Sequence, residues 1–122
     1  MRTLKVTVKR SRWIHLPTDN LSQSSLLRSK DNKMCCLGFM ALACRLTRDA
    51  IMNRGDPIDV LPSRMKKSFA SRLLEGGEYI LTKDITNTII TTNDDGHMSE
   101  SKKERKLKKL FAKIRVDINF VD

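Results

Sequence analysis

Three cysteines lie in the stretch KMCCLGFMALACRL, residues 33 to 46, which is uncharged between the basic residues at its two ends. Free thiols act as nucleophiles when they are ionised, and they bind zinc when four correctly directed donors surround the metal. Structural zinc sites use spaced pairs such as CxxC, whereas Cys35 and Cys36 are adjacent and would point about 100° apart on a helix. Cys44 and the two histidines of the chain add no recognisable ligand spacing. We therefore expect no metal site and no cofactor.

A cysteine nucleophile at Cys36 remains as an alternative. The sequence Cys36-Leu37-Gly38-Phe39 resembles the Cys-Ser-Gly-Phe motif of bacterial papain-like cell-wall peptidases, in which the thiol lies at a helix N-terminus that helps to lower its pKa. His97 lies downstream, as a base would. The competing interpretation is that free cysteines at helical spacing pack as small apolar residues. We favour this second interpretation and predict a central, buried helix over residues 34 to 46.

Two further kinds of catalytic site were considered. Asp94, Asp95 and Glu100 could hold a divalent metal as in a nuclease, but a turn followed by the acidic start of a helix explains them more simply. The five glycines form neither a Walker A sequence nor a GxGxxG motif. Enzymatic activity therefore stays open, and a non-enzymatic role is the favoured prediction.

Strict alternation of apolar and polar residues predicts two half-buried strands. One covers residues 3 to 9 and the other residues 116 to 121. The side chains expected to point inward are Leu4, Val6, Val8, Val116, Ile118 and Phe120. These two strands could pair in one small sheet.

Apolar spacing and start signals predict the helices. Besides residues 34 to 46, the expected segments are residues 48 to 52 after a Thr47 cap, residues 64 to 74, a segment with Leu81, Ile85 and Ile89 that starts at Thr82 or Asp84, and a C-terminal helix. In the last of these, Ser101 and Glu104 have capping-box spacing, and the inward residues are Leu107, Leu110, Phe111 and Ile114. In the irregular stretch between the first strand and the central helix, the expected anchors are Trp13, Ile14 and Leu16, and Leu26 and Leu27 could form a short strand.

These elements predict a single domain over residues 1 to 122 and an α+β fold, with a small sheet of the N- and C-terminal strands against about four helices. No apolar run reaches the roughly 20 residues that span a bilayer, so we expect no membrane contact. The longest such run lies in mid-chain, where it cannot be a signal peptide. Together with three cysteines that cannot all pair, this predicts a cytoplasmic protein.

Charge is unevenly distributed. The chain has 24 Lys and Arg against 14 Asp and Glu, a net charge of +10, and KKERKLKKLFAKIR at residues 102 to 115 carries +7 of it. The basic residues should cover the outer side of the C-terminal helix, where they could bind a nucleic acid backbone or an acidic protein, or simply be solvated. These candidate binding residues are Lys102, Lys103, Arg105, Lys106, Lys108, Lys109, Lys113 and Arg115. A second basic cluster, which could join them if the terminal strands are neighbours, consists of Arg2, Lys5, Lys9, Arg10 and Arg12.

The chain also resembles a group of small uncharacterised proteins of tailed bacteriophages and prophages. The resemblance lies in Arg12-Trp13 after an N-terminal strand, in Lys33 to Phe39 at the start of a helix, in Asn93-Asp94-Asp95, and in Leu110-Phe111 leading to Phe120-Val121-Asp122. It implies a phage accessory protein in the cytoplasm of a host bacterium. Many members of the group look acidic where this chain has KKERKLKK, so binding to a polyanion would be a property of this member. The leading hypothesis is a non-enzymatic protein that binds nucleic acid or an acidic host protein; the alternatives are a cysteine hydrolase and a small structural or assembly factor.

Overall fold

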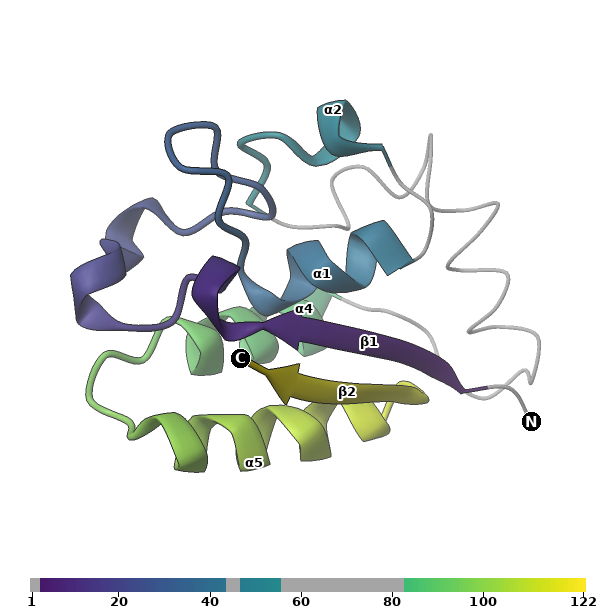
Figure 1. The fold of residues 1–122 in the computed structure, drawn as a ribbon. Helices are drawn as coiled ribbons and strands as arrows, with labels where there is room; N and C mark the ends of the chain where they lie inside the picture. The colour runs from purple at the N-terminus through teal and green to yellow at the C-terminus, as the bar shows by residue number, and fades with distance from the viewer. Residues whose placement is uncertain (1–2, 44–46, 56–82) are drawn as a thin grey trace.

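The computed structural model describes residues 3–43, 47–55 and 83–122. The strands and α-helices of these residues are, in chain order, β1 (Leu4–Lys9), α1 (Cys36–Ala43), α2 (Arg48–Ile51), α4 (Lys83–Asn93), α5 (Glu100–Ala112) and β2 (Val116–Val121). The fold is α+β, as predicted (Figure 1). None of the helices in the described residues is long and apolar enough to cross a membrane.

The sheet consists of β1 and β2, which pair in parallel with Leu4 opposite Val116 and Lys9 opposite Val121. Alternate residues point to opposite faces of a strand, so one face of the sheet is apolar and the other is polar. The inward residues Val6, Val8, Val116 and Ile118 are buried, whereas Leu4 and Phe120 are half-buried. The predicted pairing of the terminal strands is confirmed.

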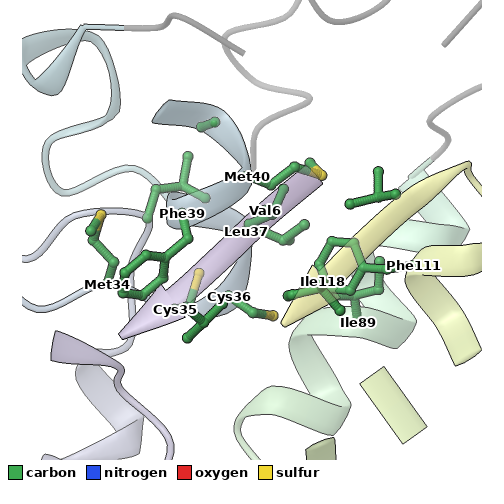
Figure 2. Close-up of a cluster of buried hydrophobic side chains, with 14 of the residues drawn as sticks. Val6, Met34, Cys35, Cys36, Leu37, Phe39, Met40, Ile89, Phe111 and Ile118 are labelled. Atoms are coloured by element: carbon green, nitrogen blue, oxygen red, sulfur yellow. The ribbon is translucent and has the colours of Figure 1, made fainter. Parts of the chain in front are cut away.

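The apolar face of the sheet lies against helices. In Figure 1, α1 and α4 lie behind the two strands and α5 runs beside β2. α1 contacts β1, and α5 contacts both β2 and α4. Figure 2 shows the core that results, in which Val6 and Ile118 from the strands meet Leu37 from α1, Ile89 from α4 and Phe111 from α5.

α1 is the buried central helix that the uncharged stretch predicted, and its first six residues are all buried. It begins at Cys36 rather than at residue 34, because Met34 forms a parallel bridge with Trp13. The Met34 N–H donates to Arg12 O at 2.8 Å, and Met34 O accepts from the Ile14 N–H at 2.7 Å. These two hydrogen bonds hold the backbone at Met34 in an extended conformation just before the helix starts.

Gly38 of α1 lies directly against another part of the backbone. A Cβ at this position would overlap the carbonyl oxygen of Leu26 and would lie 2.9 Å from Cβ of Met34. Glycine therefore lets the segment before α1 cross the helix at backbone contact distance.

Two other helices, α2 and α4, also agree with the sequence patterns. Thr47 caps α2, since its Oγ1 accepts from the Ala50 N–H at 3.2 Å, and the helix ends at Ile51, one residue earlier than predicted. The stretch around Ile89, in which Thr and Ile favour a strand, is the helix α4, and Ile89 is fully buried.

Three local predictions need correction or refinement. Leu16 is 40% exposed and is not an anchor, because the short 3₁₀ helix Pro17–Asp19 turns the chain outward at this point. Leu27 is buried but forms only an isolated bridge with Met52, not a strand. α5 is capped by Ser99, whose side chain accepts from the Lys102 N–H, so the predicted Ser101 cap is wrong and the helix starts two residues earlier.

Some predictions fall outside the described residues. They are the helix over residues 64 to 74, the end of α1 at residues 44 to 46 with Cys44, the positions Leu81 and Thr82, and Arg2.

Candidate functional site

The basic residues of α5 that remain exposed form the candidate site. The helix is anchored by Leu107 and Phe111, which are fully buried, so residues on the opposite side face solvent. We call this surface the basic face, and it consists of Lys102, Arg105, Lys106, Lys108, Lys109 and Lys113. Six of the eight predicted residues are thus brought together on one exposed surface.

Lys103 does not belong to this surface, and the prediction is wrong for it. The residue is only 1% exposed, because it lies one turn before Leu107 on the inward side of α5. Its Nζ donates to the carbonyl oxygens of His15 at 2.6 Å and of Asn93 at 2.8 Å. Burial lowers the pKa of Lys103. This side chain joins three segments of the fold and is not available to a partner.

Arg115 is also displaced from the predicted surface. α5 ends at Ala112, and Arg115 lies beyond it in a left-handed conformation with φ 60°. Its carbonyl oxygen accepts from the Leu4 N–H at 3.0 Å, which begins the pairing of β2 with β1. The residue is half-buried and serves the turn from helix to strand.

The acidic residues of α5 face away from the basic face. Glu104 accepts two hydrogen bonds from Arg10, at 2.8 and 2.9 Å, and Arg10 also contacts Asp122 at 2.8 Å. The hydrogen bonds that Arg10 donates to Glu104 and Asp122 raise the pKa of its guanidinium above the usual range. Glu100 has its own partner, since its Oε2 lies 2.7 Å from Nε2 of His15. Arg10 and His15 therefore hold the two carboxylates of the helix from the side of the fold.

The basic face itself is not neutralised within the described residues. None of the ion pairs among residues 3–43, 47–55 and 83–122 includes a residue of the basic face. Its six charged groups therefore have no Asp or Glu carboxylate of these residues within 4 Å. Lys108 has a polar partner instead, because its Nζ lies 3.4 Å from Oδ1 of Asn119 on β2. The local excess of positive charge is thus directed at solvent.

The second basic cluster is divided by the fold. Lys5, Lys9 and Arg12 are exposed, whereas Arg10 is engaged by the acids of α5 and of the C-terminus. Lys5 and Lys9 lie on the polar face of the sheet, next to the strand that Lys108 contacts. This cluster therefore adds to the basic face through Lys5 and Lys9.

The thiols of Cys35 and Cys36 are arranged for packing and not for nucleophilic attack. Cys35 is 4% exposed and Cys36 is 0% exposed, and Figure 2 shows both side chains inside the apolar cluster. Burial raises the pKa of Cys35 to about 12 and raises the pKa of Cys36 well above its usual value. Because the thiolate is the reactive form, these thiols are held in their inert form.

His97, the base considered in the hydrolase alternative, lies at the surface, whereas the thiols of Cys35 and Cys36 are buried. His97 is exposed and lines an open depression at the start of α5, together with Asp95, Met98, Ser99, Lys102 and Lys106. Its backbone N–H donates to the Asp95 side chain at 2.9 Å.

The acidic group considered for a metal is dispersed as well. Asp94 accepts a hydrogen bond from Nδ2 of Asn93 at 2.8 Å, and burial raises the pKa of its carboxyl group. Glu100 contacts His15 instead. Within the described residues, no three His, Cys, Asp or Glu side chains come together in a way that could hold a metal ion.

Asn93 makes several buried polar contacts that the sequence did not reveal. Its Oδ1 accepts from Trp13 Nε1 at 2.7 Å and from the Cys36 N–H at 3.1 Å, and its Nδ2 donates to Ile14 O at 2.8 Å. The Cys36 N–H is the first donor of α1, so a side chain from α4 caps that helix. The Trp13 ring in turn stacks on His15 with their centroids 3.7 Å apart. This network fixes α4, α1 and the start of the basic helix against one another.

No family model, curated protein or solved structure matches the chain. The resemblance to phage proteins therefore stays a prediction.

Proposed function

We propose that this protein binds the phosphate backbone of nucleic acid through the basic face. The observation that carries the proposal is the separation of charge on α5: six exposed cations lie on one side, and the acids of the helix are bound by Arg10 and His15 on the other. Exposed positive charge of this kind attracts phosphates and releases their counterions.

The chemistry of the basic face favours contacts to phosphates over contacts to bases. All of its side chains are lysine or arginine, and the aromatic residues of the described chain are buried or half-buried in the core. Single-stranded nucleic acid is usually held by bases stacked on exposed aromatic rings. Binding should therefore depend strongly on salt and weakly on base sequence.

As part of the same proposal, the protein is a non-enzymatic bacteriophage accessory protein that acts in the cytoplasm of the host, which is what its resemblance to phage proteins implies. The buried, high-pKa thiols of Cys35 and Cys36 argue against the cysteine hydrolase alternative.

The test is a salt titration of binding to a duplex of about 20 base pairs. If four or five phosphates are neutralised, a plot of log affinity against log salt concentration should have a slope of about −4, because each contact releases roughly 0.9 of a counterion. Replacing Lys102, Arg105 and Lys109, all exposed, by Gln removes three charges and keeps helix propensity. The slope should then flatten by up to about three units.

The matched control removes three exposed charges elsewhere. Lys30, Arg48 and Arg54 are exposed. Arg48 begins α2, Arg54 follows that helix closely, and Lys30 is next to Ser29, whose side chain accepts from Asn53 at 3.1 Å. Figure 1 shows α2 on the opposite side of the molecule from α5. Their replacement by Gln gives the same net charge and should leave the slope close to that of the parent. Equal losses in the two triple variants, or no binding to any nucleic acid at low salt, would refute the proposal. Binding to polyglutamate in place of nucleic acid would identify an acidic protein as the partner.

A further inference from the structure

The polar face of the sheet continues the basic face across the molecule. Side chains at every second position share one face of a strand, which on β1 gives Lys5, Thr7 and Lys9. All three are exposed. In Figure 1, α1 and α4 lie behind the strands, and no described element crosses in front of them.

Lys108 connects the two surfaces. Its Nζ lies 3.4 Å from Oδ1 of Asn119, and Asn119 pairs with Thr7 across the sheet. The polar groups of Lys108, Asn119 and Thr7 thus follow one another from the helix to β1, and Lys5 and Lys9 flank the end of that path. One carboxylate lies on this face of the strands, that of Asp117, which is exposed and opposite Lys5. A second acidic group, Asp122, lies at the end of β2 and is engaged by Arg10.

The spacing of the two basic rows exceeds what one strand of phosphates requires. A helix with its side chains is about 10–12 Å across, and neighbouring strands are about 4.8 Å apart, so the outer row of α5 and the row on β1 are separated by on the order of 15 Å. The major groove of a B-form duplex is about 12 Å wide, so phosphates of its two strands face each other over a comparable distance.

We propose that the basic face and the β1 row of Lys5 and Lys9 bind the two opposite strands of one nucleic acid duplex. This inference rests on the proposed function and adds the class of its ligand, a duplex held across a groove. The positive charges of Lys5 and Lys9 attract the phosphates of the second nucleic acid strand. The negative charge of Asp117 repels those phosphates.

Two variants that change affinity in opposite directions test the inference. Lys5→Gln with Lys9→Gln should lower affinity for the duplex by up to about 60-fold at 0.1 M salt, since two phosphate contacts are lost, and should flatten the salt slope by up to about two units. Asp117→Asn should raise the affinity, which damage to the fold would not do. The matched control, Lys30→Gln with Arg54→Gln, has the same net charge as the double variant and should bind like the parent.

A single strand of the same sequence provides the second comparison. The protein should bind the single strand through the basic face alone. The double variant of Lys5 and Lys9 should therefore bind the single strand as tightly as the parent does. If the parent binds a duplex but the sheet variants leave that binding unchanged, or weaken duplex and single strand equally, this inference is refuted while the proposed function stands. If the parent binds neither, the proposed function fails first.

Discussion

Replacing Asn93 by Ala should destabilise the fold more than its small change in volume suggests. The substitution leaves three buried groups without these partners: the Trp13 Nε1–H, the Cys36 N–H and the Ile14 carbonyl. Each unsatisfied buried group costs about 1–3 kcal/mol, so the loss of all three partners should lower the free energy of unfolding by roughly 3–9 kcal/mol. A domain of this kind has about 5–15 kcal/mol of stability in total, so the variant would lose a large share of it.

Urea denaturation followed by the fluorescence of the single tryptophan measures this loss. With a slope of about 1.5 kcal/mol/M, a loss of 4 kcal/mol moves the midpoint by about 2.5–3 M. Asn87→Ala is the matched control, because Asn87 is exposed on the same helix and alanine is the better helix former. It should be neutral or stabilising by a few tenths of a kcal/mol.

A double-mutant cycle with Trp13→Phe separates the contributions. Because this substitution removes the single tryptophan, unfolding of all four proteins is followed by circular dichroism. Phenylalanine removes the indole N–H, so Asn93→Ala in that background leaves one fewer donor unsatisfied and should cost about 1–2 kcal/mol less than it does alone. A loss below about 1 kcal/mol for Asn93→Ala, or additive effects of the two substitutions, would show that the network is not what holds these segments together.

Three further predictions concern the core and its pH dependence. A thiol reagent should label Cys36 slowly in the native protein and rapidly after denaturation, because burial raises its pKa and blocks access; fast native labelling would reopen the hydrolase alternative. Gly38→Ala should cost about 1–3 kcal/mol or more in urea denaturation because its Cβ overlaps backbone, whereas Gly55→Ala, which meets nothing within 4 Å, should cost far less. The hydrogen bonds from Arg28 lower the pKa of Asp31 to about 2, so the pair stabilises the fold above the usual carboxyl pKa and less as pH falls toward 2. Asp31→Asn should therefore be less stable than the parent at pH 7, and a difference that persists unchanged at pH 2 would contradict this.

The elements that the sequence predicted well are those whose pattern is local. Alternation placed both strands, and the spacing of Leu107 and Phe111 placed the inward side of α5. The Thr47 cap was recognisable because a cap acts within one turn. The parallel orientation of the strands was not predicted, since alternation is the same in both directions.

The errors concern residues whose position depends on distant segments. A lysine on a basic helix is expected in solvent, but Lys103 lies where two carbonyl groups from other segments need donors. Ser101 and Glu104 have the spacing of a capping box, yet Glu104 binds Arg10 from the end of β1 and Ser99 caps the helix. The three buried side-chain hydrogen bonds of Asn93 span 57 to 80 positions, and no local sequence pattern predicts them. Six of the eight predicted binding residues do form one surface, because that part of the prediction depended only on the helical period.

The parallel pairing of β1 with β2 has a consequence for synthesis of the chain. Leu4 and Val116 are 112 positions apart, so the first strand is made long before its partner exists. At a synthesis rate of about 5–20 residues per second, β1 waits roughly 6–22 s, and until then its valines have no sheet to join. The apolar face of a lone strand is a site of misassociation, and contacts this distant in sequence form late. The charged residues that alternate with those valines, Lys5 and Lys9, would keep the waiting strand from associating with other chains.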